Sequence, residues 1–295
     1  MKVPFLSILG LGLASVVNGK IIQSSDGTDI FADAVGNPRN PPIVFVHGFT
    51  LSALVFDHLF HDERLLDHFY LVSYDLRGHG RSGKPNTTEA YTSNLFADDF
   101  SAVIKAFSVK SPLLVAWSYG GTVGADIFAH LPPRTILGIV GIAAIPTVEL
   151  VKNTPLVISL EPLFGVTDDV AVAINTRSTF VDACFNDAST IAVDIVWSWL
   201  GSSVLQLPPI TVLVGQRTQD PTNLFEAGSH GFPYLFISGT EDKIALNANY
   251  TAELRPHFPN LEVVKIQGGS HAVFIEKEDE FIRTLVPFAN KILRG

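Results

Sequence analysis

The stretch Pro112-Leu-Leu-Val-Ala-Trp-Ser118-Tyr-Gly-Gly-Thr122 decides how the chain folds. Its aliphatic run, residues 113–115, is long enough for a strand that is buried on both faces. Residues 122–130 can continue as a helix, so a strand and a helix meet at Ser118. Such a corner strains the backbone of its central residue and turns that side chain outward. It also needs small neighbours, because the start of the helix passes close over the strand, and Ala116 and Gly120 meet this need.

This pattern matches the nucleophile elbow, which is usually written G-x-S-x-G. Ala116 stands in place of the first glycine and is one methyl group larger, which still keeps the site small. A serine in an ordinary glycine-containing turn would give the same local sequence. The elbow therefore needs support from other stretches of the chain.

A base and an acid for this serine follow later strands. A serine hydroxyl is a weak nucleophile, and it needs an adjacent base that a third group orients. His271 follows the last predicted strand, residues 261–266, and Asp242 comes three residues after the strand that ends at Gly239. We therefore predict Ser118, Asp242 and His271 as the catalytic residues.

Two other carboxylates are alternatives to Asp242. Glu241 is its immediate neighbour, and Glu149 follows an earlier predicted strand, residues 136–145. The position within the motif favours Asp242.

An oxyanion site is expected from two further main-chain N–H groups. His47-Gly48-Phe49 follows the apolar strand 43–46, and Tyr119 comes directly after the predicted nucleophile at the start of a helix. Two fixed donors at a developing oxyanion distinguish a catalytic serine from a merely exposed one. The alternative for residues 47–49 is a simple turn that ends the strand.

Strands alternate with helices over most of the chain. After two short strands, 20–23 and 28–34, apolar strands at 43–46, 71–74, 113–115 and 136–145 are separated by helical segments. This alternation predicts an α/β fold with a mostly parallel central sheet and helices on both faces. It stops near Pro146 and resumes at Tyr234, so residues 20–146 and 230–295 are predicted to form the core and residues 147–229 an inserted helical cap.

The predicted cap is rich in aromatic residues. Trp197 and Trp199 lie two positions apart, so on a helix they point about 200° apart and cannot both face a pocket. We predict that Trp197 and Phe180 contribute to substrate binding, with one tryptophan facing Ser118 and the other packed inside the cap. The alternative is a second helical layer without a role in the site.

Composition and charge narrow the class of partner. The 295 residues are 47% hydrophobic and 17% charged, which is typical of a globular protein with a large core. The net charge of −9 argues against nucleic acid or an anionic membrane as a partner. The single cysteine, Cys184, lies among apolar residues and allows no internal disulfide.

Two sequence motifs resemble cofactor-binding or metal-binding motifs but lack a feature that such sites require. Residues 78–83 spell G-x-G-x-x-G, but Lys84-Pro85-Asn86 follow, so no helix N-terminus is available for a pyrophosphate. His58 and His61 are three residues apart, not four as in a zinc-binding helix. We therefore expect no cofactor and no metal.

The N-terminal segment, residues 1–19, has the pattern of a signal peptide: Lys2, an apolar run over 5–17 and small residues before a cleavage site. The apolar run is too short to span a bilayer comfortably, so stable membrane insertion is not expected. Secretion fits two glycosylation sequons, at Asn86 and Asn249. We predict a secreted glycoprotein.

Together these motifs resemble the α/β-hydrolase family, in its serine-nucleophile branch of esterases, perhydrolases and carbon–carbon bond hydrolases. The resemblance rests on residues 47–49, the segment Asp75-x-Arg77-Gly-His-Gly-x-Ser82, the elbow, and Asp242 with His271. It covers residues 21–293, and the cap is its least typical part. Epoxide hydrolases and haloalkane dehalogenases of the family carry an aspartate where this chain has Ser118, which argues against both.

The resemblance implies a cofactor-free hydrolase acting on a small or medium apolar ester. Ser118 would attack, His271 would act as base and then acid, Asp242 would orient it, and the Phe49 and Tyr119 N–H groups would hold the oxyanion. Residues 75–82 would form a structural turn near the site. Perhydrolysis, carbon–carbon bond cleavage and a ligand-binding relative with a slow triad remain alternatives.

Overall fold

The computed structural model describes residues 19–151 and 155–295. All of the predicted signal peptide except its last residue lies outside these ranges. Within them, no helix is both long enough and apolar enough to cross a membrane.

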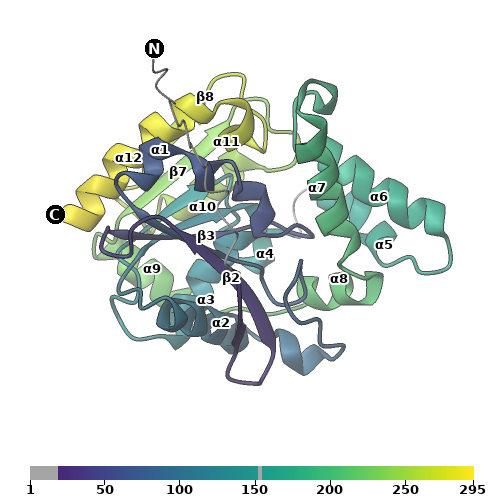
Figure 1. Cartoon of the computed structure of the whole chain (residues 1–295), viewed down its shortest axis with the longest axis horizontal. Coiled ribbons are helices and arrows are strands. Elements are labelled where there is room, and N and C mark those ends of the chain that lie inside the picture. The colour runs from purple at the N-terminus through teal and green to yellow at the C-terminus, as the bar shows by residue number, and fades with distance from the viewer. Residues whose placement is uncertain (1–18, 152–154) are drawn as a thin grey trace, which may run out of the picture.

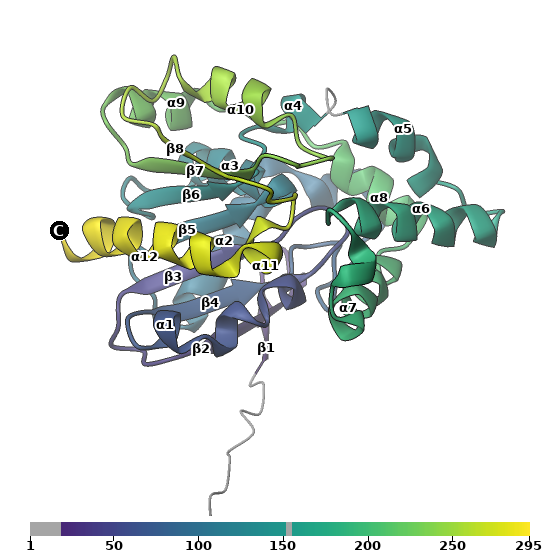
Figure 2. The same ribbon diagram turned by 90° about the horizontal axis from the view of Figure 1, so that it is seen from above.

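A single eight-stranded sheet runs through the molecule in the order β1-β2-β4-β3-β5-β6-β7-β8 (Figures 1 and 2). The strands β1 (Lys20–Gln23) and β2 (Asp29–Val35) pair antiparallel with each other, and β2 pairs antiparallel with β4. The other six strands are parallel: β3 (Pro42–Val46), β4 (Tyr70–Tyr74), β5 (Leu113–Trp117), β6 (Gly138–Ile142), β7 (Tyr234–Gly239) and β8 (Glu262–Ile266). The predicted fold class is confirmed.

Helices cover both faces of the sheet because alternate residues of each strand point to opposite faces. One apolar cluster joins Phe45 and Val115 to α1 (Glu63–Leu66), α11 (Val273–Glu276) and α12 (Glu278–Arg294). The other joins Val44 and Leu114 to α2 (Ser93–Ala106), α3 (Val123–His130) and α10 (Asn247–Leu254). All five residues of β5 are buried, as its apolar sequence predicts.

Between β6 and β7 the described chain forms only helices and their connections. They are α4 (Val148–Val151), α5 (Pro155–Phe164), α6 (Val170–Ala183), α7 (Val193–Val204), α8 (Pro208–Gly215) and α9 (Thr222–Ser229). Both views place α5–α8 together at one end of the sheet (Figures 1 and 2). Helix α9 lies within the predicted cap range but packs against α3 of the core, through buried Leu224.

Short 3-10 helices complete the connections: η1 (Ala53–Phe56), η2 (Leu59–His61), η3 (Thr88–Tyr91), η4 (Ser118–Thr122) and η5 (Ala188–Thr190). The most important of them is η4, since it joins β5 directly to α3 and begins at Ser118. The parallel strands β3, β5, β6, β7 and β8 all end on this side of the sheet, so the loops that follow them meet there.

Candidate active site

The corner between β5 and η4 places Ser118 in a strained conformation. Its φ angle is +53°, a left-handed value that is uncommon for any residue other than glycine. The neighbouring Gly120 has no room for a side chain, because a Cβ there would lie 2.5 Å from the carbonyl oxygen of Val46. A Cβ on Gly48 would lie 3.1 Å from the Cβ of Ser118. The small residues are thus required by the close approach of β3 to the turn.

His271 and Asp242 form a buried pair next to this turn. The Nδ1 atom of His271 lies 2.9 Å from Oδ2 of Asp242, and their side chains are only 1% and 2% exposed. Burial by itself would raise the pKa of Asp242, but the His271 imidazole and hydrogen bonds from the Ala245 main chain and the Asn247 amide lower the pKa overall. An ionised Asp242 accepts the Nδ1–H of His271, which leaves Nε2 as the acceptor of the ring. Among the described residues, Nε2 has no hydrogen-bond partner.

The alternative acids lie elsewhere. Glu241 is exposed, and its carboxylate accepts a 3.3 Å hydrogen bond from the hydroxyl of Thr240. Glu149 is exposed at the start of α4. The structure pairs His271 with Asp242.

Ser118 and His271 line the same small cavity. Its volume is about 20 Å³, which is room for about one water molecule. Apart from these two residues the walls are mostly apolar: Phe49, Tyr119, Ile145, Val151, Phe180, Ile244, Ala245 and Tyr250.

The two predicted oxyanion residues, Phe49 and Tyr119, both reach this cavity. Tyr119 is the second residue of η4, so its N–H has no carbonyl partner within that helix. The N–H of Phe49 donates no hydrogen bond to any residue that the structure describes. Both groups are therefore available to an oxygen atom placed beside Ser118.

A buried histidine shapes the loop that carries Phe49. His47 donates its Nδ1–H to the carbonyl oxygen of Gly48 at 2.8 Å, and its Nε2 accepts the N–H of Leu76 at 2.9 Å. Burial lowers the pKa of His47 to about 4. The ring is therefore neutral at physiological pH, and its single tautomer ties the end of β3 to the end of β4.

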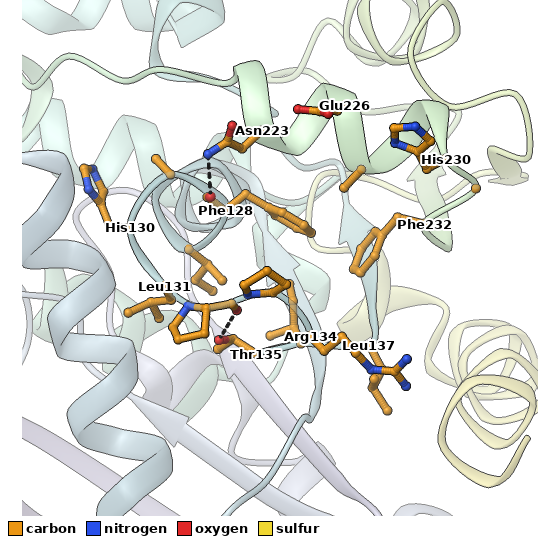
Figure 3. Close-up of a pocket in the computed structure, with 17 residues that line it drawn as sticks. Phe128, His130, Leu131, Arg134, Thr135, Leu137, Asn223, Glu226, His230 and Phe232 are labelled. Carbon is orange, nitrogen blue, oxygen red and sulfur yellow. Dashed lines mark hydrogen bonds between the residues drawn. The ribbon is translucent and has the colours of Figure 1, made fainter.

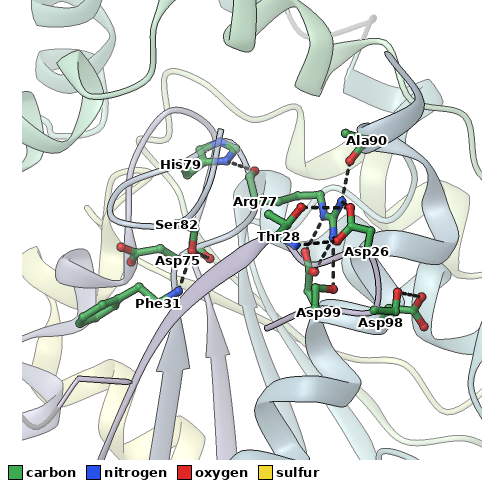
Figure 4. A network of polar contacts seen from close by, with 12 residues as sticks. Asp26, Thr28, Phe31, Asp75, Arg77, His79, Ser82, Ala90, Asp98 and Asp99 are labelled. Atoms are coloured by element: carbon green, nitrogen blue, oxygen red, sulfur yellow. Dashed lines mark hydrogen bonds and ion pairs between the residues drawn. The ribbon is translucent and has the colours of Figure 1, made fainter. Parts of the chain in front are cut away.

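The segment from Asp75 to residue 82 is a network of internal polar contacts (Figure 4). Asp75 accepts hydrogen bonds from the N–H of Ala53 and from the main chain and side chain of Arg81. Arg77 is fully buried and paired with Asp99 at 2.6 Å. These contacts hold loops together beside the cavity, and none of the residues in these contacts lines the cavity itself.

Of the two residues predicted to bind substrate, only Phe180 lines the cavity. Trp197 is 70% exposed on the outer face of α7, so the structure corrects the prediction that it faces the pocket. Trp199 is 1% exposed and packs against Trp117 and Phe185, with ring centres 5.3 and 4.9 Å apart. The face that we expected to look onto Ser118 points to solvent, because α7 packs on the core through the opposite side.

Several cavity residues were not predicted from the sequence. Ile244 and Ala245 follow Asp242, so their place in the loop after β7 was a usable signal. Tyr250 lies on α10 and Ile145 in the connection to α4, where an apolar residue gives no sign of its direction.

A much larger cavity lies beside the turn that precedes β6, at the amino end of that strand (Figure 3). Its volume is about 860 Å³, and it is formed by the end of α3, the turn that precedes β6, and α9. Phe128, Arg134, Glu226 and Phe232 are among its lining residues, and it contains none of the predicted catalytic residues. Its size alone does not make it the site of the chemistry.

The remaining sequence motifs occupy ordinary positions. In the described ranges no three histidine, cysteine or carboxylate residues gather in a way that would hold a metal ion. The Nε2 atom of His58 lies 2.9 Å from the carbonyl oxygen of Phe274. Cys184 is buried, and the glycosylation sequon residues Asn86 and Asn249 are exposed.

Comparison with known proteins agrees with this architecture. The model of the family described as alpha/beta hydrolase fold matches residues 41–278, and the chain therefore belongs to the α/β-hydrolase family. A crystal structure of a Burkholderia cenocepacia protein assigned as an aryl esterase superposes with a TM-score of 0.84 at 26% identity, covering 94% of this chain and 100% of that one.

Two curated relatives differ in how much of them is matched. A non-heme chloroperoxidase of Streptomyces lividans is 26% identical over 270 residues, which are 85% of this chain and 92% of that protein. A Mycobacterium tuberculosis protein named as an oxidoreductase, EphD, is 41% identical over 113 residues, which are 38% of this chain and only 19% of that protein. Membership of the α/β-hydrolase family, with relatives that include esterases, is what these comparisons show.

Proposed function

We propose that the protein is a serine esterase that cleaves small or medium apolar esters. One observation carries the proposal. Ser118, which is held at a positive φ angle, shares an apolar cavity with His271, and Nδ1 of His271 is hydrogen-bonded to the ionised carboxylate of Asp242. The esterase-like relative from Burkholderia supports the same class of reaction.

In the proposed mechanism, the hydroxyl of Ser118 attacks the ester carbonyl while Nε2 of His271 accepts its proton. The carbonyl oxygen becomes an oxyanion, which the N–H groups of Phe49 and Tyr119 stabilise. His271 then gives the proton to the leaving alcohol, and an acyl-enzyme remains. Water repeats these steps with the same base and releases the acid, which restores the Ser118 hydroxyl.

The geometry of His271 supports its role as the base. Asp242 holds the Nδ1–H tautomer and stabilises the imidazolium that forms during attack. Since Nε2 has no partner among the described residues, it is free to accept a proton from the neighbouring serine. The apolar cavity walls favour an acyl or alcohol group that carries no charge.

The test is covalent labelling with a fluorophosphonate probe together with hydrolysis of p-nitrophenyl esters of increasing chain length. We expect the wild-type protein to be labelled and Ser118→Ala to be neither labelled nor active, with its fold intact. Near-normal turnover by Ser118→Ala would refute the mechanism. A labelled protein without turnover would favour the ligand-binding alternative.

Perhydrolysis is a second candidate, because another relative is named a bifunctional esterase/perhydrolase. Hydrogen peroxide would replace water in attacking the acyl-enzyme, and a peracid would leave instead of an acid. Measuring peracid and acid formed from one ester at increasing peroxide concentration distinguishes the two reactions.

We also propose that the protein is secreted and glycosylated at Asn86 and Asn249. Both side chains are exposed, Asn86 in a loop and Asn249 on α10. Endoglycosidase treatment of material from a eukaryotic host should lower the apparent mass, and an unchanged mass would count against glycosylation.

A further inference from the structure

A polar cluster of three buried residues and one half-buried residue ties the base of the inserted helices to the nucleophile turn. It consists of Arg217 and Gln219, from the connection between α8 and α9, and of Thr122 and Asp126, from η4 and α3. We call these four residues the base clamp. None of them lines the cavity at Ser118, so they act on the site only through other groups.

Arg217 is the centre of the base clamp. Its side chain is fully buried and forms an ion pair with buried Asp126 at 3.0 Å, and it donates a hydrogen bond to the hydroxyl of Thr122. Its guanidinium carbon lies 3.8 Å from the ring centre of Phe96 and 5.1 Å from that of Tyr119. A buried charge is stable only beside an opposite charge, so the ion pair with Asp126 and the other contacts hold the guanidinium of Arg217 in one place.

Gln219 joins the two chain ends of the inserted segment to the same helix. Its Oε1 accepts the N–H of Val148, the first residue of α4, at 3.0 Å. Its Nε2 donates to the carbonyl oxygen of Thr122 at 2.7 Å and to Oδ1 of Asp126 at 2.6 Å. The segment that leaves β6 and the segment that approaches α9 are thus fixed to one point.

The nucleophile turn has two more hydrogen bonds to the chain between β6 and β7, one to the connection before α4 and one to α8. The carbonyl oxygen of Ser118 accepts the N–H of Ile145 at 2.9 Å. The hydroxyl of Tyr119 donates to the carbonyl oxygen of Val214, in α8, at 3.0 Å. Tyr119 and Thr122 are therefore held by the inserted segment, and Ser118 by the connection that leads into it, so the direction of the Tyr119 N–H depends on where these residues lie.

We propose that Arg217, together with Gln219, is a positioning residue for the oxyanion site. The base clamp keeps η4, and with it the Tyr119 N–H, in place. This inference rests on the proposed function, in which Tyr119 is an oxyanion donor.

The expected change in kcat and KM follows from the step at which the Tyr119 N–H acts. An oxyanion donor stabilises the transition state much more than the bound ester, so a displaced donor lowers kcat and leaves KM nearly unchanged. Removal of one such donor lowers kcat by about 10²–10³-fold, and a displaced one should lower it by about 10–100-fold.

The experiment compares Arg217→Met and Arg217→Lys with a matched control, Arg177→Met. Arg177 is another buried arginine of the inserted helices. Among the described residues it donates hydrogen bonds to the carbonyl oxygens of residues 173, 203 and 206 and lies 5.7 Å from the ring centre of Phe164, and it has no hydrogen bond to η4. On a short soluble p-nitrophenyl ester we expect Arg217→Met to lose about 10–100-fold in kcat with KM within about threefold. Arg217→Lys should recover part of the loss, and Arg177→Met should keep kcat within about twofold.

Two further readouts separate positioning from stability. Fluorophosphonate labelling of Arg217→Met should slow in parallel with kcat, since the same N–H groups stabilise the phosphoryl oxygen. Gln219→Leu should act in the same direction, and the double variant with Arg217→Met should lose less than the product of the two single effects, because both residues hold one helix.

An unchanged kcat in Arg217→Met would overturn the inference, and so would an equal loss in Arg177→Met. If Arg217→Met does not fold, as judged by the absence of a cooperative unfolding transition, Arg217→Lys and Gln219→Leu provide the test. A normal kcat in both of these variants would overturn the inference. Failure of the proposed function looks different, since Ser118→Ala would then retain activity.

Discussion

Replacing Trp199 by alanine should destabilise the protein strongly, although Trp199 does not touch the cavity. Its ring is almost fully buried and packs against Trp117, Phe185 and Phe274. Deleting a large buried aromatic side chain costs about 3–5 kcal/mol, from lost burial and the cavity left behind. With a shift of roughly 2–4 °C per kcal/mol, the melting temperature should fall by about 6–20 °C.

The same substitution should also disturb the active site slightly. Trp117, against which Trp199 packs, donates its indole N–H to the carbonyl oxygen of His271 at 2.9 Å. A void beside Trp117 lets this anchor shift, so we expect kcat to fall by less than about tenfold, a change of about 1.4 kcal/mol in the barrier.

The assay is urea and thermal unfolding of Trp199→Ala beside Trp197→Ala, with ester hydrolysis measured on both. Trp197 is exposed on the same helix, so its removal should change the free energy of unfolding by no more than about 0.5 kcal/mol. Equal stability losses in the two variants would refute this account of how α7 packs.

Three other predictions follow from the site. Asp242→Asn should lower kcat far more than Glu241→Gln, because only Asp242 bonds His271; equal losses would contradict the assignment of the acid. Phe180→Ala should enlarge the cavity and shift preference towards bulkier p-nitrophenyl esters, and an unchanged chain-length profile would contradict its role as a wall. His47 should make the free energy of unfolding depend on pH. The pKa of its ring is about 4 in the folded protein and about 6.5 in the unfolded chain, so between these pH values only the unfolded chain binds a proton on this ring. Stability should therefore be full above pH 6.5 and fall by about 3 kcal/mol towards pH 4, and urea unfolding of His47→Gln should show a flatter profile than wild type.

The sequence alone located the features that depend on local chemistry. The buried strand, the small residues around Ser118 and the order of Asp242 and His271 after later strands are all readable, because strand ends and tight turns restrict residue type. In a parallel sheet the carboxyl ends of the strands meet at one edge, so these separated residues were expected to come together there. Asp242 and His271 pair at 2.9 Å and Ser118 lines the same cavity as His271, in agreement with that expectation.

Only the tertiary structure decided what the inserted helices do. Helical periodicity shows that Trp197 and Trp199 point in different directions, but both are apolar, and nothing local says which side meets the core. The same holds for Arg217 and Gln219, whose partners lie far away in the chain on α3. The sequence predicts a charged or amide side chain in a connection to be a surface residue. Packing buries Arg217 fully and Gln219 partly, because it brings their partners to them and removes water.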